Sequence, residues 1–239
     1  MTTPAITTTP TKLFYFFVAI FVISLLGFFP TYLVKFPRFE GLSYAHHFHG
    51  FIASTWLLLL ICQAWLIRKK NYRLHRLTGK LSFVIMPLLI LSLSMVAGAS
   101  YSSNIKTTDR ATALAAMANG IPEMFFLGLL FTLGMLYRRN SGYHLRFLTC
   151  TGLIMLGPGL GRFLIAFCHL PFQYAIPLLI LSTTGVGIAW LAVDIRNRRS
   201  AFPMAVYVAI GVLAFLIQAN KFSEPWQQFA GWWASHFYH

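Results

Sequence analysis

The sequence predicts an all-α membrane protein, a polytopic bundle of seven transmembrane helices with its N-terminus inside and its C-terminus outside. The chain of 239 residues is 57% hydrophobic and 10% charged, whereas soluble domains have about 25% charged residues. Seven apolar runs follow one another, each close to the length of about 20 residues that crosses a bilayer as a helix. Lysine and arginine gather in alternate loops between these runs.

The first run must be distinguished from a secretory signal because it follows a short polar stretch, TTTPTK. It is long and has no clear small-residue cleavage site, so we predict a retained helix. The later runs are joined by short loops, which leave no room for a soluble catalytic module within a single integral domain, residues 1–239. The spans are expected at Leu13 to Leu33, Ala45 to Ile67, Leu81 to Ser100, Thr112 to Tyr137, Leu145 to Cys168, Tyr174 to Val193 and Met204 to Gln218.

The distribution of basic residues predicts the orientation. Of the 19 lysines and arginines, 13 lie on one face and five on the other. The positive-inside rule makes the first face cytoplasmic, where basic loops meet anionic lipid head groups. This placement accounts for the net charge of +14 without a nucleic-acid partner. The first face carries Lys12, Arg68, Lys69, Lys70, Arg73, Arg76, Lys80, Arg138, Arg139, Arg146, Arg196, Arg198 and Arg199, and the second carries Lys35, Arg38, Lys106, Arg110 and Lys221.

The tail after the last span, residues 219–239, is dense in aromatic side chains. Rings with a polar edge favour the membrane interface, so we expect a short interfacial helix. Alternatively, the tail covers an outer site, where His236 or His239 joins His46, His47 and His169 in holding a metal ion. The aromatic residues concerned are Trp226, Phe229, Trp232, Trp233, Phe237 and Tyr238.

Polar residues inside the spans are costly in lipid unless they face a partner or a cavity. In spans two and five they recur at spacings of three and four, which places them on one helical face that should point into the bundle. The stripe of span two is His46, His49, Ala53, Trp56, Leu60, Gln63 and Ile67, and that of span five is His144, Leu148, Thr151, Met155, Pro158, Arg162, Ile165 and His169.

Depth along the helices brings two opposite charges to one level. With a rise of about 1.5 Å per residue, Glu123 and Arg162 both lie ~9 Å below the outer boundary, and His49 lies ~6 Å below it. Pro122 and the glycines around Pro158 can free backbone carbonyls that line a cavity. We therefore predict an outer-leaflet ligand pocket. The alternative is an ion pair that only fixes helix packing. The pocket residues are His49, Trp56, Asn119, Glu123 and Arg162.

Histidines near both membrane surfaces suggest a second possibility. His75 and His144 begin spans three and five at the cytoplasmic side and could ligate heme iron, with Arg76 or Arg146 pairing with propionates or lipid head groups. On the outer side, His46, His49 and His169 could bind heme or a transition metal. The arrangement resembles diheme membrane cytochromes of the b561 kind, but span four has no histidine and His75 and His169 lie at the rims.

The runs HGFIASTW, HRLTG and YHLRFL, between Tyr44 and His169, carry a closer resemblance. They are similar to uncharacterised bacterial multi-pass inner-membrane proteins with an H-R-x-x-G loop and a later H-x-R-[FL] loop. The resemblance implies a location in the bacterial cytoplasmic membrane and supplies no activity. It favours His49, His75, Arg76, Gly79, His144, Arg146 and Arg162 as positions of interest.

Three functions remain open from the sequence. The first is a protein that binds or transports a small ligand or protons through the outer pocket. The second is a heme or metal redox protein that exchanges electrons with quinone, and the third is a structural or assembly subunit of a membrane complex. The sequence shows no nucleophile beside a base, no paired carboxylates and no phosphate-binding motif. It therefore gives no indication of a hydrolase or a transferase.

The charge distribution makes a topological prediction. Reporter fusions after Asn71, Ser141 and Asn197 should be cytoplasmic, because the loops there carry most of the basic residues. Fusions after Phe36, Asn104 and Tyr238 should be on the opposite side. The side of each fusion is measured with two reporters, one active only in the cytoplasm and one active only in the periplasm. A fusion after Tyr238 that is active in the cytoplasm would contradict the predicted orientation.

Overall fold

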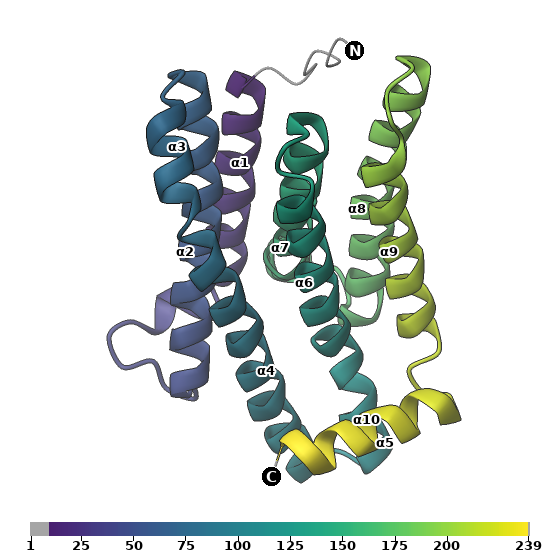
Figure 1. Ribbon diagram of the computed structural model, residues 1–239. Coiled ribbons are helices and arrows are strands. Elements are labelled where there is room, and N and C mark those ends of the chain that lie inside the picture. The colour runs from purple at the N-terminus through teal and green to yellow at the C-terminus, as the bar shows by residue number, and fades with distance from the viewer. Residues whose placement is uncertain (1–9, 239) are drawn as a thin grey trace.

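The computed structural model describes residues 10–238, and within this range the chain is helical and contains no strand. Seven of its helical segments are long and apolar enough to cross a membrane, which confirms the predicted all-α bundle of seven spans (Figure 1). Five spans are single helices: α1 (Pro10–Phe28), α2 (Tyr44–Arg68), α7 (Ser141–Phe167), α8 (Phe172–Arg196) and α9 (Phe202–Ala219).

Spans three and four are more complex than the apolar runs suggested. Span three is α4 (Ser82–Thr107), and a short helix, α3 (Tyr72–Gly79), precedes it. Span four is broken into α5 (Arg110–Ala116), the 3₁₀ helix η2 (Met117–Asn119) and α6 (Ile121–Leu136). A second 3₁₀ turn, η1 (Leu33–Lys35), lies in the loop between α1 and α2, and α10 (Glu224–Phe237) follows the last span.

The two ends of the bundle differ in composition. The start of α1 and the turns that follow α2, α6 and α8 lie at one end, which we name the basic end after its arginines and lysines (Figure 1). The other end, which we name the α10 end, is crossed by α10 (Figure 1). Which end faces the cytoplasm remains the prediction made from charge.

Helices α1 and α7 pack with their backbones in contact. A Cβ atom added to Gly27 would lie 1.9 Å from the carbonyl oxygen of Gly159, and one added to Gly159 would lie 2.6 Å from Cα of Ser24. Small residues allow such close approach, and close packing drives helix association in lipid. The glycines of α7 therefore act in helix packing and fix α1 against it.

Helix α10 packs on the broken span. The indole Nε1 of Trp226 donates to the carbonyl oxygen of Leu114 at 3.1 Å. The side-chain amide of Gln227 donates to the carbonyl oxygen of Ala111 at 3.2 Å. Ala230 and Ala234 are buried against the bundle. The aromatic tail is thus a helix, and its interfacial position remains a prediction. The opposite face of α10 exposes Phe229, Trp232 and Phe237.

A buried ion pair joins α7 to α8 at the basic end. Arg146 Nε donates to Asp194 Oδ2 at 2.7 Å, and Nη2 donates to Oδ1 at 2.6 Å. Nη1 of the same guanidinium donates to the carbonyl oxygen of Gly142 at 3.0 Å. Both side chains are buried, Asp194 completely. The bidentate geometry supplies the strong, fully bonded contact that a buried pair of charges requires.

Removing one partner of this pair should destabilise the protein strongly. We expect Arg146→Met to cost about 3 to 5 kcal/mol, because Asp194 stays buried without a cation. The double variant Arg146→Met with Asp194→Leu should cost less than the sum of the single variants. Unfolding of the detergent-solubilised protein by SDS measures these values.

The exposed pair Arg38 and Glu40, 3.9 Å apart, provides the control. Arg38→Met should change stability by about 0 to 1 kcal/mol, because solvent screens exposed charges. Additive losses at Arg146 and Asp194 would contradict a coupled pair.

Candidate functional site

The predicted pocket residues come from four helices that meet in the half of the bundle nearer α10. His49 and Trp56 lie on α2, Asn119 ends η2, Glu123 is in the first turn of α6, and Arg162 is in the last two turns of α7. In the structure, Arg162 lies close enough to interact electrostatically with two of the others, His49 and Glu123. His46 also interacts electrostatically with Arg162.

The guanidinium of Arg162 is held from two sides. Its Nη1 donates to the carbonyl oxygen of Pro158 at 3.1 Å, and its Cζ lies 4.4 Å from the ring centroid of Phe28 on α1. A guanidinium has five N–H donors, and this is the single hydrogen bond found for it among residues 10–238. Arg162 is therefore oriented by the protein while most of its donors remain free.

Glu123 is the acidic partner near Arg162, but the two side chains do not form a direct ion pair. Within the described chain, the ion pairs shorter than 4 Å are Arg38 with Glu40 and Arg146 with Asp194. Glu123 lies in the first turn of α6, where the positive end of the helix dipole favours a carboxylate. No hydrogen bond to its carboxyl group is found in residues 10–238, so its acceptor capacity is unused.

Histidines at the start of α2 border this pair. His49 Nδ1 lies 3.0 Å from Ser92 Oγ on α4, and Ser92 donates to the carbonyl oxygen of Leu89. In the loop outside the spans, burial raises the pKa of the Tyr32 hydroxyl above its usual value, so it stays protonated. Tyr32 Oη lies 2.6 Å from His47 Nδ1 and ties the loop to α2.

Trp56 and Asn119 make contacts elsewhere. Trp56 Nε1 donates to Thr151 Oγ1 on α7 at 3.2 Å, and the ring is buried in the core. The side-chain oxygen of Asn119 accepts from Nε2 of Gln218 on α9 at 2.5 Å. Trp56 is thus a packing residue between two helices, and Asn119 belongs to a contact at the break in span four.

Most of the buried polar atoms that lack a partner lie at the α10 end. Among residues 10–238, four buried side-chain atoms have no hydrogen-bond partner: Ser24 Oγ, Gln218 Oε1, Trp233 Nε1 and Tyr238 Oη. Three of them belong to the α10 end, since Gln218 is near the end of α9 and Trp233 and Tyr238 belong to α10 or follow it, whereas Ser24 lies at the contact between α1 and Gly159 of α7. This end holds hydrogen-bonding groups that the protein does not satisfy.

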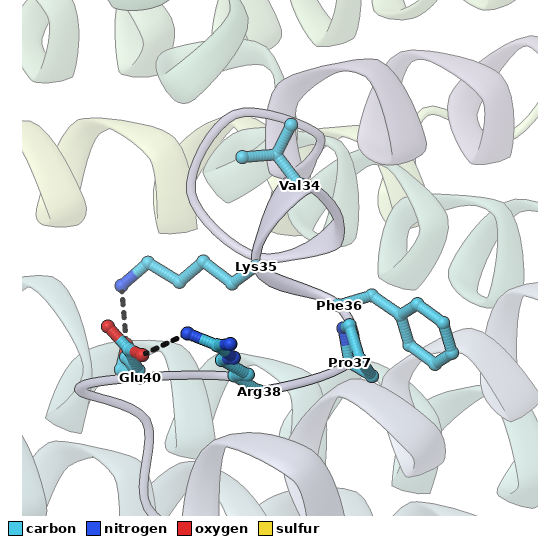
Figure 2. Close-up of a pocket in the computed structure, with 6 residues that line it drawn as sticks. All are labelled: Val34, Lys35, Phe36, Pro37, Arg38 and Glu40. Carbon is cyan, nitrogen blue, oxygen red and sulfur yellow. Dashed lines mark hydrogen bonds and ion pairs between the residues drawn. The ribbon is translucent and has the colours of Figure 1, made fainter.

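An open hollow of about 540 Å³ lies in the loop between α1 and α2, away from the predicted pocket residues. Figure 2 shows Lys35 and Arg38 both directed toward Glu40. Lys35 Nζ donates to the Glu40 carbonyl oxygen at 2.9 Å, and Arg38 pairs with the Glu40 carboxylate. These charges satisfy one another on an exposed surface, so the hollow is a weaker candidate site than Arg162.

At the basic end, His75 and His144 lie within electrostatic reach of each other. His144 Nδ1 lies 2.8 Å from the carbonyl oxygen of Gly134. The Gln63 amide, oriented to suit its neighbours, donates to His75 Nδ1 at 2.5 Å and accepts from the Gly79 N–H at 3.2 Å. In this orientation the amide favours the His75 tautomer that carries its proton on Nε2, and the opposite amide orientation favours the tautomer protonated on Nδ1. Heme ligation by His75 and His144 therefore stays a prediction.

The remaining predicted positions do not converge. His169 is exposed after α7, Arg76 is exposed on α3, and Arg146 pairs with Asp194 within the protein. No group of three or more metal-binding side chains is found in the described residues. His236 lies 2.8 Å from the Trp232 carbonyl oxygen, and His239 is outside the described residues.

Comparisons with known proteins add no family. Searches against protein-family models, curated proteins and solved structures found no match to this chain. Two polar residues, Asp194 and Gln218, are not among the predicted site residues, and their contacts are seen only in the structure. Each is a polar residue near the end of an apolar run, the one signal in the sequence that could have pointed to it.

We predict that the purified protein shows no Soret band, even from cells supplied with a heme precursor, because span four has no histidine and His75 and His169 lie at the rims, where water and lipid head groups compete. Absorption spectra of wild type, His75→Ala and His144→Ala measure this, with His236→Ala as a surface control. A Soret band in the wild type that disappears in His144→Ala would overturn the prediction.

Proposed function

We propose that this multi-pass membrane protein binds a small ligand with an anionic group in the α10-end half of its bundle, at Arg162. The observation that carries the proposal is the state of the Arg162 guanidinium. One backbone carbonyl and one aromatic ring orient it, and its other donors are free. An ionised side chain in lipid needs a partner, and the nearest acid, Glu123, does not contact it directly.

The geometry of a guanidinium defines the class of ligand. Its planar fork of N–H donors matches the two oxygens of a carboxylate or phosphate group, and stacking on a ring leaves that edge accessible. Phe28 is such a ring, and Arg162 is an exposed residue. A carboxylate or phosphate ester therefore fits this position better than a neutral molecule.

Glu123 and His49 give the site a way to exchange protons. A ligand anion next to Arg162 also lies near Glu123, and two like charges in a medium of low dielectric favour uptake of a proton. Ligand binding would then be coupled to protonation at this site. Glu123 and His49, which can take up protons, distinguish the proposed site from a simple anion pocket. Such coupling is consistent with transport as well as with binding.

The proposal includes the surroundings of the protein. Seven apolar helices indicate a lipid bilayer. We place the basic end at the cytoplasmic face, in contact with anionic head groups, on the charge distribution alone. The bacterial inner membrane follows from the resemblance of the loop motifs. The ligand site would then open toward the outer face.

Melting shifts of the detergent-solubilised protein test the ligand site. The probes are acetate, benzoate, methyl phosphate and a neutral short-chain quinone. At a concentration of 100 Kd, a bound ligand adds about 2.7 kcal/mol, which corresponds to roughly 5 to 10 °C for a chain of this size. We expect at least one anion to give this shift in wild type and Arg38→Met, and none in Arg162→Met.

Arg38→Met is the matched control, because Arg38 is an exposed arginine in the loop at the same end. An anion that stabilises wild type and Arg162→Met equally would show that Arg162 is not part of a site. A shift with quinone alone would also refute the anionic class of ligand.

A further inference from the structure

The break in span four forms a second cluster of polar groups, separate from Arg162. Helix α5 and the 3₁₀ turn η2 end at Asn119, and α6 starts at Ile121. Gln218, in the last turn of α9, donates from Nε2 to Asn119 Oδ1 at 2.5 Å. Gln218 is a buried residue, 8% exposed, and its Oε1 has no donor among the described residues.

The backbone at the break adds a further oxygen. In a helix the carbonyl of Ala118 would accept from the N–H of residue 122, which here is a proline without an N–H. The hydrogen-bond ladder resumes at Met124, which donates to the Gly120 carbonyl oxygen at 3.4 Å. The carbonyl of Ala118 is thus freed by the sequence itself, in the residue before Asn119.

Helix dipoles at the break favour positive charge. Gln218 lies in the last turn of α9, an 18-residue helix whose C-terminal end carries a partial negative charge. The last carbonyls of a helix also lack intrahelical donors. The N-terminus of α6 has the opposite sign, but Glu123 in its first turn offsets it. The nearby cation, Lys221, lies over the ring of Phe222 at 5.9 Å.

We propose that the break in span four is a binding site for a monovalent cation, Na⁺, held by the side-chain oxygen of Gln218 and the carbonyl oxygen of Ala118, with Asn119 Oδ1 accepting from Gln218 Nε2 and so fixing the amide. Hard cations take neutral and charged oxygen ligands. In membrane transporters, interrupted helices and the C-terminal ends of half-helices coordinate Na⁺. Here an unpartnered buried amide oxygen, a proline-freed carbonyl and a helix C-terminus occur at one interruption.

Thermal melts of the full chain in detergent test the site. The melts compare NaCl with choline chloride at equal ionic strength, so that general screening is held constant. We expect wild type to melt higher in NaCl. Gln218→Glu should respond at a roughly tenfold lower Na⁺ concentration, because a carboxylate binds a cation more strongly than an amide. Gln218→Met should lose the response.

Gln173→Glu is the matched control, since Gln173 is an exposed glutamine at the start of α8. It should respond to Na⁺ as wild type does. If Gln218→Met does not fold, the comparison between Gln218→Glu and Gln173→Glu decides. Equal melting in the two salts for wild type and Gln218→Glu would overturn the proposal and leave the amide oxygen to water.

The cation site stands independently of the ligand site. Its observations concern Gln218, Asn119 and the proline after them, whereas the ligand site depends on Arg162. Loss of anion binding in Arg162→Met therefore says nothing against Na⁺ binding. A Na⁺ response without any anion response would refute the proposed function and support this inference.

Discussion

Lipid donates and accepts no hydrogen bonds, so each polar group inside this bundle depends on another part of the chain. The two ends meet that requirement differently. At the basic end, Arg146 and Asp194 bond each other at two points, and His144 lies against the carbonyl of Gly134. Of the four buried unpartnered side-chain atoms in residues 10–238, those of Gln218, Trp233 and Tyr238 lie at the α10 end. The basic end thus satisfies its buried ion pair within the chain, whereas the α10 end holds most of the buried polar atoms that lack a partner.

The position of Arg162 follows from helix packing. Contact between Gly27 and Gly159 brings the backbones of α1 and α7 together. Phe28 follows Gly27 directly, and Arg162 follows Gly159 by one turn, so the same contact sets the ring beside the guanidinium. A larger residue at either glycine would separate the two helices and move the ring from the cation. The glycines and proline in GPGLG therefore act through packing and through the carbonyl of Pro158, which accepts from Arg162.

Hydrophobic length made the seven spans predictable, and the structure brings His49 and Arg162 within electrostatic reach of each other. The partners could not be predicted in the same way, because periodicity gives the face of a helix and not the residue opposite it. Asp194 lies one residue beyond the predicted end of span six at Val193, so the predicted span excludes the buried partner of Arg146. Equal depth suggested an ion pair between Glu123 and Arg162, whereas the structure gives electrostatic proximity without direct contact.

One short segment connects the features of the α10 end. Helix α10 bonds to the carbonyls of Ala111 and Leu114 in α5, the break follows at Asn119, and Glu123 begins the helix beyond it. A cation at the break would fix the direction in which α6 starts and hence the position of Glu123 relative to Arg162. An anion at Arg162 would act on Glu123 and so on the same segment. Each ligand would then change the free energy of binding the other, since coupling between two sites is reciprocal.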